Sequence, residues 1–232
     1  MRTVFVSLAL MAVASAGILN FVELPEDALN FVAQGAKAPA VVCVDSKLKY
    51  CQARFNEKLN INTSLDWHDA DKILAAVISY SDANETDMLN LCSYRAQFYQ
   101  CLGRIYSGCV SLYNIVGKPG TSIKNAYTYV DMYKSLDFAC NDGFEEVANQ
   151  YSCLQTVAMT QAYQGCVNTF TANVTGHPEA LCSSANTAGK CFNDVYAKSC
   201  QGDTHGAGWF GCESFLVSFD ESCWPKNRCY VY

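Results

Sequence analysis

Hydrophobic residues recur along most of the chain at intervals of three and four positions, the spacing of one face of an α-helix. No segment shows the strict alternation of apolar and polar residues that is typical of half-buried β-strands. The pattern therefore predicts an all-α protein. The expected helices are Leu24–Ala36, Pro39–Leu59, Ser64–Ser81, Thr86–Val116, one capped by Thr121 or Ser122 that runs through Leu136, one capped by Asp142 and Glu145 that runs toward Phe170, Lys190–Cys200 and Trp209–Cys223.

Residues 1–16 have the features of a secretory signal peptide. Arg2 supplies a positive charge, Val4–Val13 is an apolar run broken only by Ser7, and Ala14-Ser15-Ala16 is a small-x-small cleavage pattern. The apolar run is too short for the ~20 residues that a bilayer-spanning helix needs. Cleavage after Ala16 is therefore expected, and the protein is predicted to be secreted and extracellular.

The rest of the chain divides into an N-terminal helical segment, residues 17–90, and a cysteine-rich helical region, residues 91–232. The longest later aliphatic run, Ile73–Ile78, is flanked by Asp71, Lys72 and Ser79. It is typical of a buried helix face, so no membrane span is expected.

All fourteen cysteines lie after the predicted signal peptide. An even number of cysteines in a secreted chain favours complete pairing in up to seven disulfides. The predicted disulfide cysteines are Cys43, Cys51, Cys92, Cys101, Cys109, Cys140, Cys153, Cys166, Cys182, Cys191, Cys200, Cys212, Cys223 and Cys229. Three N-x-Ser/Thr sequons, at Asn62, Asn84 and Asn173, predict a glycoprotein.

The cysteine spacing restricts the pairing. If Cys92, Cys101 and Cys109 share one continuous helix, neighbours are ~12–13 Å apart along its axis, beyond the ~7 Å limit of a disulfide. Cys92 and Cys101 also face opposite sides of that helix, which predicts a central helix joined to two neighbours. Cys212 and Cys223 fall on one face and are expected to bind one neighbouring surface.

An internal repeat is visible around these cysteines. The pattern Leu91-Cys92-Ser93, Cys101-Leu102, Ile105-Tyr106, Cys109 recurs as Leu181-Cys182-Ser183, Cys191-Phe192, Val195-Tyr196, Cys200. One interpretation is a duplication that produced two related helical units, near 91–180 and 181–232. The other is convergence of two amphipathic helices that carry cysteines.

The net charge and the sequence motifs argue against several classes of function. The net charge of −6 makes nucleic acid and anionic membrane surfaces poor partners. His68-Asp69 is similar to the His-Asp pair of secreted phospholipases A2, but the bracketing cysteines and glycine-rich calcium loop of that family are missing, so His68 is expected to be a helix surface residue. His177 and His205 are expected in loops. No nucleophile elbow, metal motif or nucleotide-binding motif occurs, and no catalytic residue, metal or cofactor is predicted.

Tyrosines are the more suggestive feature. They gather at helical spacing, which is most typical of a core and an amphipathic surface. The alternative is an aromatic-lined cavity for an apolar ligand, or a protein-binding face. These residues are Tyr94, Tyr99, Tyr106, Tyr113, Tyr127, Tyr129 and Tyr133.

The spacing of single cysteines over Cys92–Cys223, with an aromatic-bearing last helix that ends in cysteine, resembles the nematode secreted cysteine-rich domain of unknown function 19. The matching residues are Cys92, Cys101, Cys109, Cys140, Cys153, Cys166, Cys182, Cys191, Cys200, Trp209, Phe210 and Cys223, while Cys43, Cys51, Cys212 and Cys229 are additional. The resemblance implies a disulfide-rich helical fold and supplies no catalytic residues.

The sequence thus predicts a disulfide-rich helical bundle that acts as an extracellular binding protein rather than an enzyme. Its partner would be an extracellular protein or a glycan. The alternatives are a carrier of a small apolar ligand and, third, a secreted hydrolase with an unrecognised site. An apolar pocket would favour the carrier.

Overall fold

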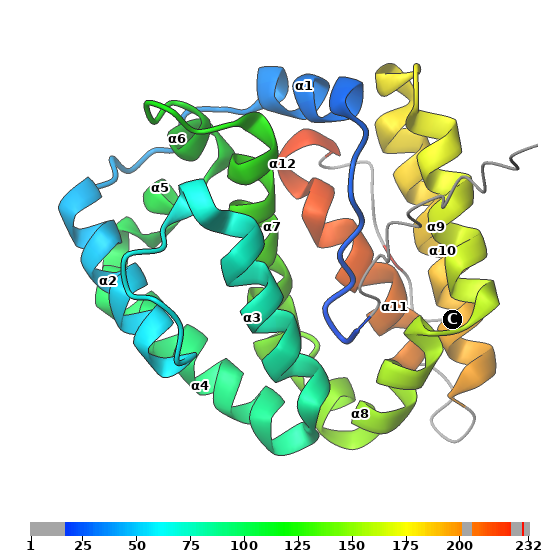
Figure 1. The fold of residues 1–232 in the computed structure, drawn as a ribbon. Coiled ribbons are helices and arrows are strands. Elements are labelled where there is room, and N and C mark those ends of the chain that lie inside the picture. The colour runs from blue at the N-terminus through cyan, green and yellow to red at the C-terminus, as the bar shows by residue number, and fades with distance from the viewer. Residues whose placement is uncertain (1–16, 201–205, 224–228, 230–232) are drawn as a thin grey trace, which may run out of the picture.

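The computed structural model describes residues 17–200, 206–223 and 229, and confirms the all-α, disulfide-rich fold (Figure 1). The predicted signal peptide lies outside these residues. The helices are α1 (Glu26–Gly35), α2 (Asp45–Lys58), α3 (Ala70–Ala83), α4 (Glu85–Leu102), α5 (Tyr106–Cys109), α6 (Leu112–Val116), α7 (Ile123–Cys140), α8 (Phe144–Ala158), α9 (Gln161–Val174), α10 (Leu181–Ser199), α11 (Gly206–Leu216) and α12 (Asp220–Cys223), with short 3₁₀ turns η1 (Trp67–Asp69), η2 (Gly103–Ile105), η3 (Pro178–Ala180) and η4 (Val217–Phe219). Among the described helices, none is long and apolar enough to cross a membrane.

Seven disulfides pair all fourteen cysteines and divide the chain into two covalently closed sets. Three disulfides lie within residues 43–140, which we call the N-terminal half: Cys43–Cys109, Cys51–Cys101 and Cys92–Cys140. Four lie within residues 153–229, the C-terminal half: Cys153–Cys200, Cys166–Cys191, Cys182–Cys223 and Cys212–Cys229. No disulfide joins the halves. The boundary falls between residues 140 and 153, a different place from the predicted units 91–180 and 181–232.

Both halves use the same order of pairing around one long helix. On α4, Cys92 pairs with a later cysteine and Cys101 with an earlier one, and Cys109 after this helix also pairs backward. Around α10, Cys182 pairs forward, whereas Cys191 and Cys200 pair backward.

The partner helices extend the repeat. Cys51 on α2 is followed four residues later by the buried Phe55, and Cys166 on α9 is followed four residues later by the buried Phe170. The shared pairing order and these matched positions extend the similarity of the two halves, and the duplication stays a prediction.

The core is continuous across the two halves and centres on α7. Eleven of the eighteen residues of α7 are buried, against six of eighteen in α4. The prediction that the helix carrying Cys92 is central was therefore wrong. Helix α7 packs against α1, α3, α4 and α6 on one side and against η4 and α11 on the other, and it lies near the middle of Figure 1. Three of the predicted aromatic positions, Tyr127, Tyr129 and Tyr133, are buried in this core, whereas Tyr99 on α4 is exposed.

Two predicted helices are interrupted. The expected Thr86–Val116 helix ends at Leu102, because Gly103 has a φ of 59°, a left-handed conformation that favours glycine. Cys109 therefore lies on α5 rather than on the helix of Cys92, although the conclusion that these cysteines take separate partners holds. The helix expected to run toward Phe170 breaks before α9, where the Thr160 hydroxyl accepts a hydrogen bond from the Tyr163 N–H and caps a new helix.

The starts of two further helices differ from the prediction. The segment after Pro39 is not helical up to Val44, because it lies against α5 at Gly108, where an added Cβ would overlap the Val41 carbonyl oxygen. Helix α8 begins after Gly143 with no side-chain cap, so the predicted cap by Asp142 was wrong.

The last helices also differ from prediction. Helix α10 begins nine residues before the expected Lys190, and its added turns include small buried residues such as Gly189, on which α11 packs directly. The 3₁₀ turn η4 separates Cys212 from Cys223, so these cysteines do not share one face: Cys223 binds α10, and Cys212 binds Cys229.

The disulfide division gives a direct test. We expect a sequence-specific protease site inserted between Asp142 and Gly143 to release two fragments on denaturing electrophoresis without reductant, because no disulfide crosses this point. The same site inserted between Asn60 and Ile61 is the control. It lies inside the loop closed by Cys51–Cys101, so its fragments should separate only after reduction. Fragments of the first variant that stay joined would contradict the pairing.

Candidate functional site

A cavity of about 750 Å³ lies between the two halves, beneath the extended segment of residues 17–25. We call this segment the strap. In Figure 1 it is the dark-blue trace that runs from beside α11, in the middle of the molecule, up to α1. The lining residues come from the strap and α1 (Phe21, Val22, Glu23, Leu24, Pro25, Leu29), from α3 (Asp71, Leu74), from α7 (Lys124, Tyr127, Thr128, Asp131) and from the end of α9 (Val167, Asn168, Thr171, Ala172, Thr175).

Side-chain size on α9 explains why the junction is hollow. The face of α9 that carries Phe170 packs into the C-terminal half, where Phe170 contacts Phe215 and Phe219. The face turned to the junction carries Thr171 and Ala172. Because these side chains are small, they do not fill the space between α9 and α7, and an apolar-walled cavity remains.

Two buried polar groups form the floor of the cavity. Asp131 and Tyr127 lie one turn apart on α7 and are 4% and 7% exposed. Asp131 Oδ1 and the Tyr127 hydroxyl have no hydrogen-bond partner in the described part of the chain. Buried polar atoms are nearly always paired in folded proteins, so such atoms on a cavity wall indicate groups available to a ligand.

Ionisation of the Asp131 carboxyl is unfavourable in its buried position. Burial raises its pKa to about 6, although a hydrogen bond from the Ser218 side chain and the charge of Lys134 both act to lower it. Burial also raises the pKa of the Tyr127 hydroxyl well above its ordinary value, and the nearby Asp131 charge adds to this effect. Lys134 is held at 3.1 Å by Glu221, so it does not neutralise Asp131 directly.

Charged residues at the rim join the strap to α7. Lys124 Nζ lies 2.5 Å from Glu23 Oε1, and this ion pair raises the pKa of the lysine. Asp71 on α3 lies at the same rim. Among the described residues that line the cavity, three are carboxylates and one is a lysine, so the cavity has an acidic excess.

Polar contacts hold the strap in place. Asn20 is buried, accepts a hydrogen bond from the Tyr163 hydroxyl and lies 3.5 Å from Ser214 Oγ. Ile18 and Leu19 are buried in the core beside it. The strap is therefore a packed wall of the cavity.

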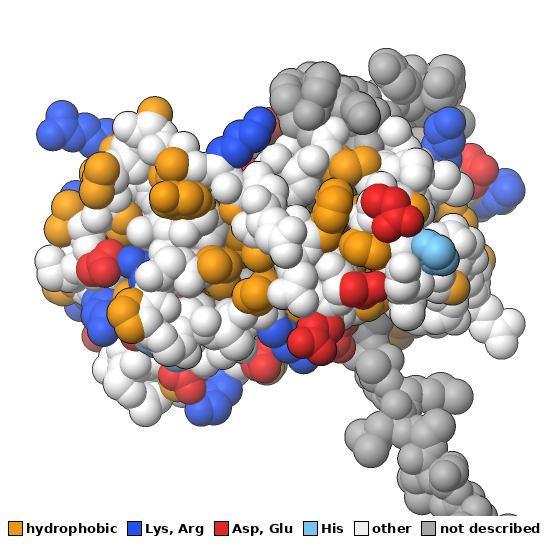
Figure 2. Space-filling view, turned by 90° about the horizontal axis from the view of Figure 1, so that it is seen from above, with side chains coloured by type: hydrophobic (Ala, Val, Ile, Leu, Met, Phe, Trp, Pro, Cys, Tyr) orange, Lys and Arg blue, Asp and Glu red, His pale blue; other side chains and the backbone are white. Residues whose placement is uncertain are grey.

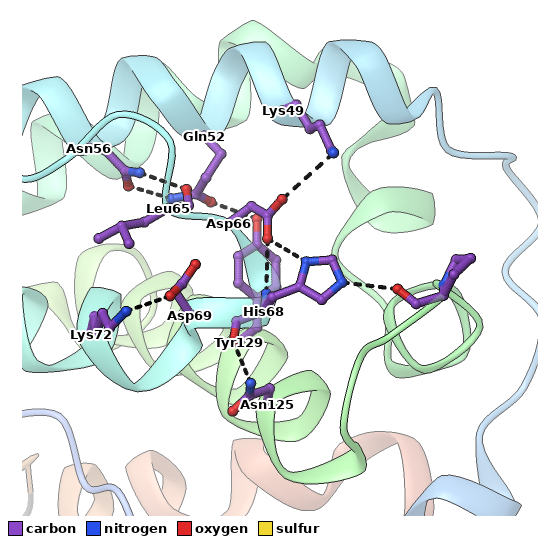
Figure 3. A network of polar contacts seen from close by, with 11 residues as sticks. Lys49, Gln52, Asn56, Leu65, Asp66, His68, Asp69, Lys72, Asn125 and Tyr129 are labelled. Atoms are coloured by element: carbon purple, nitrogen blue, oxygen red, sulfur yellow. Dashed lines mark hydrogen bonds and ion pairs between the residues drawn. The ribbon is translucent and has the colours of Figure 1, made fainter.

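The His68 region forms a separate polar network on the N-terminal half (Figure 3). His68 Nδ1 lies 2.7 Å from Asp66 Oδ1, and Nε2 lies 3.0 Å from the Pro119 carbonyl oxygen. Asp69, the partner considered from the sequence, instead binds Lys72. The hydrogen bond to Pro119 and then that to Asp66 raise the histidine pKa. Because both ring nitrogens are occupied, this network joins η1 to the segment before α7 and does not present a general base.

The other candidate positions lie apart from the cavity floor. His177 is exposed beside Glu179, and His205 lies outside the described residues. The three sequon asparagines are all exposed: Asn62 accepts hydrogen bonds from Ser64, Asn84 caps α4, and Asn173 lies in the last turn of α9. Glycosylation stays a prediction. No group of three or more metal-binding side chains occurs in the described ranges.

Searches of protein-family models, of curated proteins and of solved structures found no match to this chain. The resemblance to the nematode domain of unknown function 19 therefore stays a prediction.

Sequence reasoning missed Asp131, whereas Tyr127 belongs to the tyrosines for which an aromatic-lined cavity was the alternative to a core. The signal available was an acid, Asp131, inside the otherwise apolar and aromatic stretch Tyr127–Tyr133 of a predicted helix. The tyrosines around it were interpreted as core, which is correct for Tyr129 and Tyr133: both donate hydrogen bonds to the buried Gln52.

The buried carboxyl should cost stability above its pKa. Asp131 is neutral in the folded and unfolded states below its ordinary pKa of 3.8, and it is charged in both above about 6. We therefore expect Asp131→Asn to unfold with nearly the wild-type free energy near pH 3.5 but to be more stable at pH 7, by up to about 3 kcal/mol. Guanidinium unfolding with the disulfides intact measures this difference.

A matched control is Asp142→Asn, at an exposed position, which should show no pH-dependent gain. Equal stability of Asp131→Asn and wild type across the whole pH range would contradict the inferred cost.

Proposed function

We propose that this protein is a secreted carrier that binds a small, largely apolar molecule in the cavity between its two halves. The observation that supports this most directly is the cavity itself. Its volume, about 750 Å³, falls within the ~300–1,000 Å³ typical of small-molecule sites, and its wall combines apolar side chains with a few buried polar groups.

The disulfide frame supports the same proposal. Disulfides of this number are typical of proteins that work in oxidising extracellular fluid. The predicted signal peptide and sequons agree with that location.

A second candidate is a protein-interaction module, favoured by exposed aromatic side chains at Tyr50, Tyr99 and Tyr113. On the face shown in Figure 2, however, hydrophobic side chains gather in several separate spots rather than in one continuous patch. Protein-binding surfaces more often present a contiguous apolar area.

A substitution that fills the cavity tests the proposed carrier function. We expect Ala172→Trp to lower the affinity for Nile red, a neutral apolar fluorescent dye, by about tenfold or more, because the indole would occupy the space that the dye needs. Ala162→Trp is the matched control, because Ala162 is exposed on the same helix and does not line the cavity. Fluorescence titration measures both.

Native mass spectrometry of the protein secreted from eukaryotic cells is a second measurement. Extra mass that is lost on denaturation, and that is absent from Ala172→Trp, would support the carrier. Equal dye binding by both tryptophan variants would contradict it and favour the interaction module.

A further inference from the structure

We propose that the ligand of the cavity carries a protonated amine at one end of an apolar body, with its ammonium group against the Asp131 carboxylate. This inference rests on the proposed carrier function and specifies the ligand class.

The charged residues that line the cavity favour a cationic ligand. Glu23 and Lys124 neutralise each other across the rim. The two other carboxylates of the described lining, Asp71 at the rim and Asp131 at the floor, face no lysine within ion-pair distance. An anionic head group would be repelled along the whole path into the cavity, whereas an ammonium group would be attracted.

The hydrogen-bond acceptors at the floor of the cavity also favour an ammonium group. An ammonium has three N–H donors and no acceptor. Asp131 Oδ1 and the Tyr127 hydroxyl oxygen have no partner at hydrogen-bond geometry among the described residues, although the Ser218 side chain lies close enough to lower the pKa of both groups. One ammonium can donate to both, and its charge would compensate the buried carboxylate, which is otherwise unpaired.

The residues around Asp131 do not prevent its carboxylate from binding an ammonium group. From α7 it faces Tyr127 and Lys134, from η4 Ser218, and from α12 Glu221. Lys134 is bound to Glu221, and Ser218 supplies a neutral hydrogen bond. Leu24, Leu29, Leu74 and Val167 on the cavity wall then provide the surface for the apolar body.

The test is displacement of Nile red by decylamine, decanol and decanoic acid, which share one apolar chain and differ in the head group. At about pH 7.5 we expect decylamine to act at a concentration about tenfold or more below that of decanol, with the acid weakest, because a charge-assisted hydrogen bond exceeds a neutral one. Asp131→Asn should remove the advantage of the amine and leave decanol nearly unchanged. Asp71→Asn, at the exposed rim, is the control and should retain most of that advantage.

The amine proposal can also be tested on the wild-type protein by changing the pH. Lowering the pH from about 7.5 to about 5 should remove the preference for decylamine as Asp131 takes up a proton, while decanol binding stays constant. Equal displacement by amine and alcohol at about pH 7.5, or an unchanged preference in Asp131→Asn, would overturn the amine proposal. Failure of Nile red and of all three compounds to bind would instead overturn the carrier function itself.

A second inference concerns the start of the strap and comes from a different observation. Gly17 packs so closely on Asp82, in the last turn of α3, that an added Cβ would overlap the Asp82 carboxylate oxygens. The Ile18 N–H donates a hydrogen bond to the same carboxyl, which is half-buried. We infer that cleavage after Ala16 places the new α-ammonium group of Gly17 against Asp82, and that this ion pair anchors the strap over the cavity.

The α-amino group reports on this pair directly. In protein whose N-terminus is shown to be Gly17, we expect the α-amino pKa, measured by NMR titration, to lie above its ordinary ~7.7–8.0. Asp82→Asn should return it to that range. A variant with one extra alanine before Gly17 displaces the charge without changing Asp82 and should do the same. An ordinary pKa in the wild type would overturn the inference.

Discussion

Covalent closure within each half is the constraint on which the rest of the structure depends. Each half folds around one long helix, α4 or α10, that is joined by disulfides to a helix before it and to a segment after it. A disulfide limits the unfolded chain most when it closes a long loop, and six of these seven close loops of 25 to 66 residues. The halves can therefore hold their shape with little demand on the interface between them, which is formed by packing and hydrogen bonds alone.

That division explains where the cavity lies. Inside each half, aromatic side chains fill the core: Phe98 stacks on Tyr133 in the first, and Phe215 packs against Phe170 and Phe192 in the second. At the junction α9 contributes no aromatic side chain to the cavity wall, only Val167, Asn168, Thr171 and Ala172, and the strap closes the gap from outside. A rigid frame on either side allows an unfilled space that a less constrained protein would collapse or fill. Asp131 also lies at this junction, where burial raises the pKa of its carboxyl to about 6.

The helical fold was predictable because it depends on local properties. Apolar spacing located most of the helices, and of the two predicted caps, Thr121 and Ser122, Ser122 is the one whose hydroxyl accepts a hydrogen bond from the Asn125 N–H. Prediction failed where long-range packing decided the outcome. Helix α10 includes the buried small residues Ala188 and Gly189, which let α11 pack closely and give no hydrophobic signal in the sequence.

The sequence by itself determined the helical class, the even set of cysteines and the internal repeat, because periodicity and composition are properties of the chain alone. It also determined that Cys92 and Cys101, which share α4, take separate partners, since helix geometry forbids a disulfide between them. Only the tertiary structure decided which cysteines pair, that α7 rather than α4 is central, and that Asp131 faces a cavity while Tyr129, two residues earlier, is bonded in the core. The reason is physical: the environment of a side chain depends on residues far away in sequence. Here the strap, α3, α7 and α9, which are far apart in the sequence, together line one cavity.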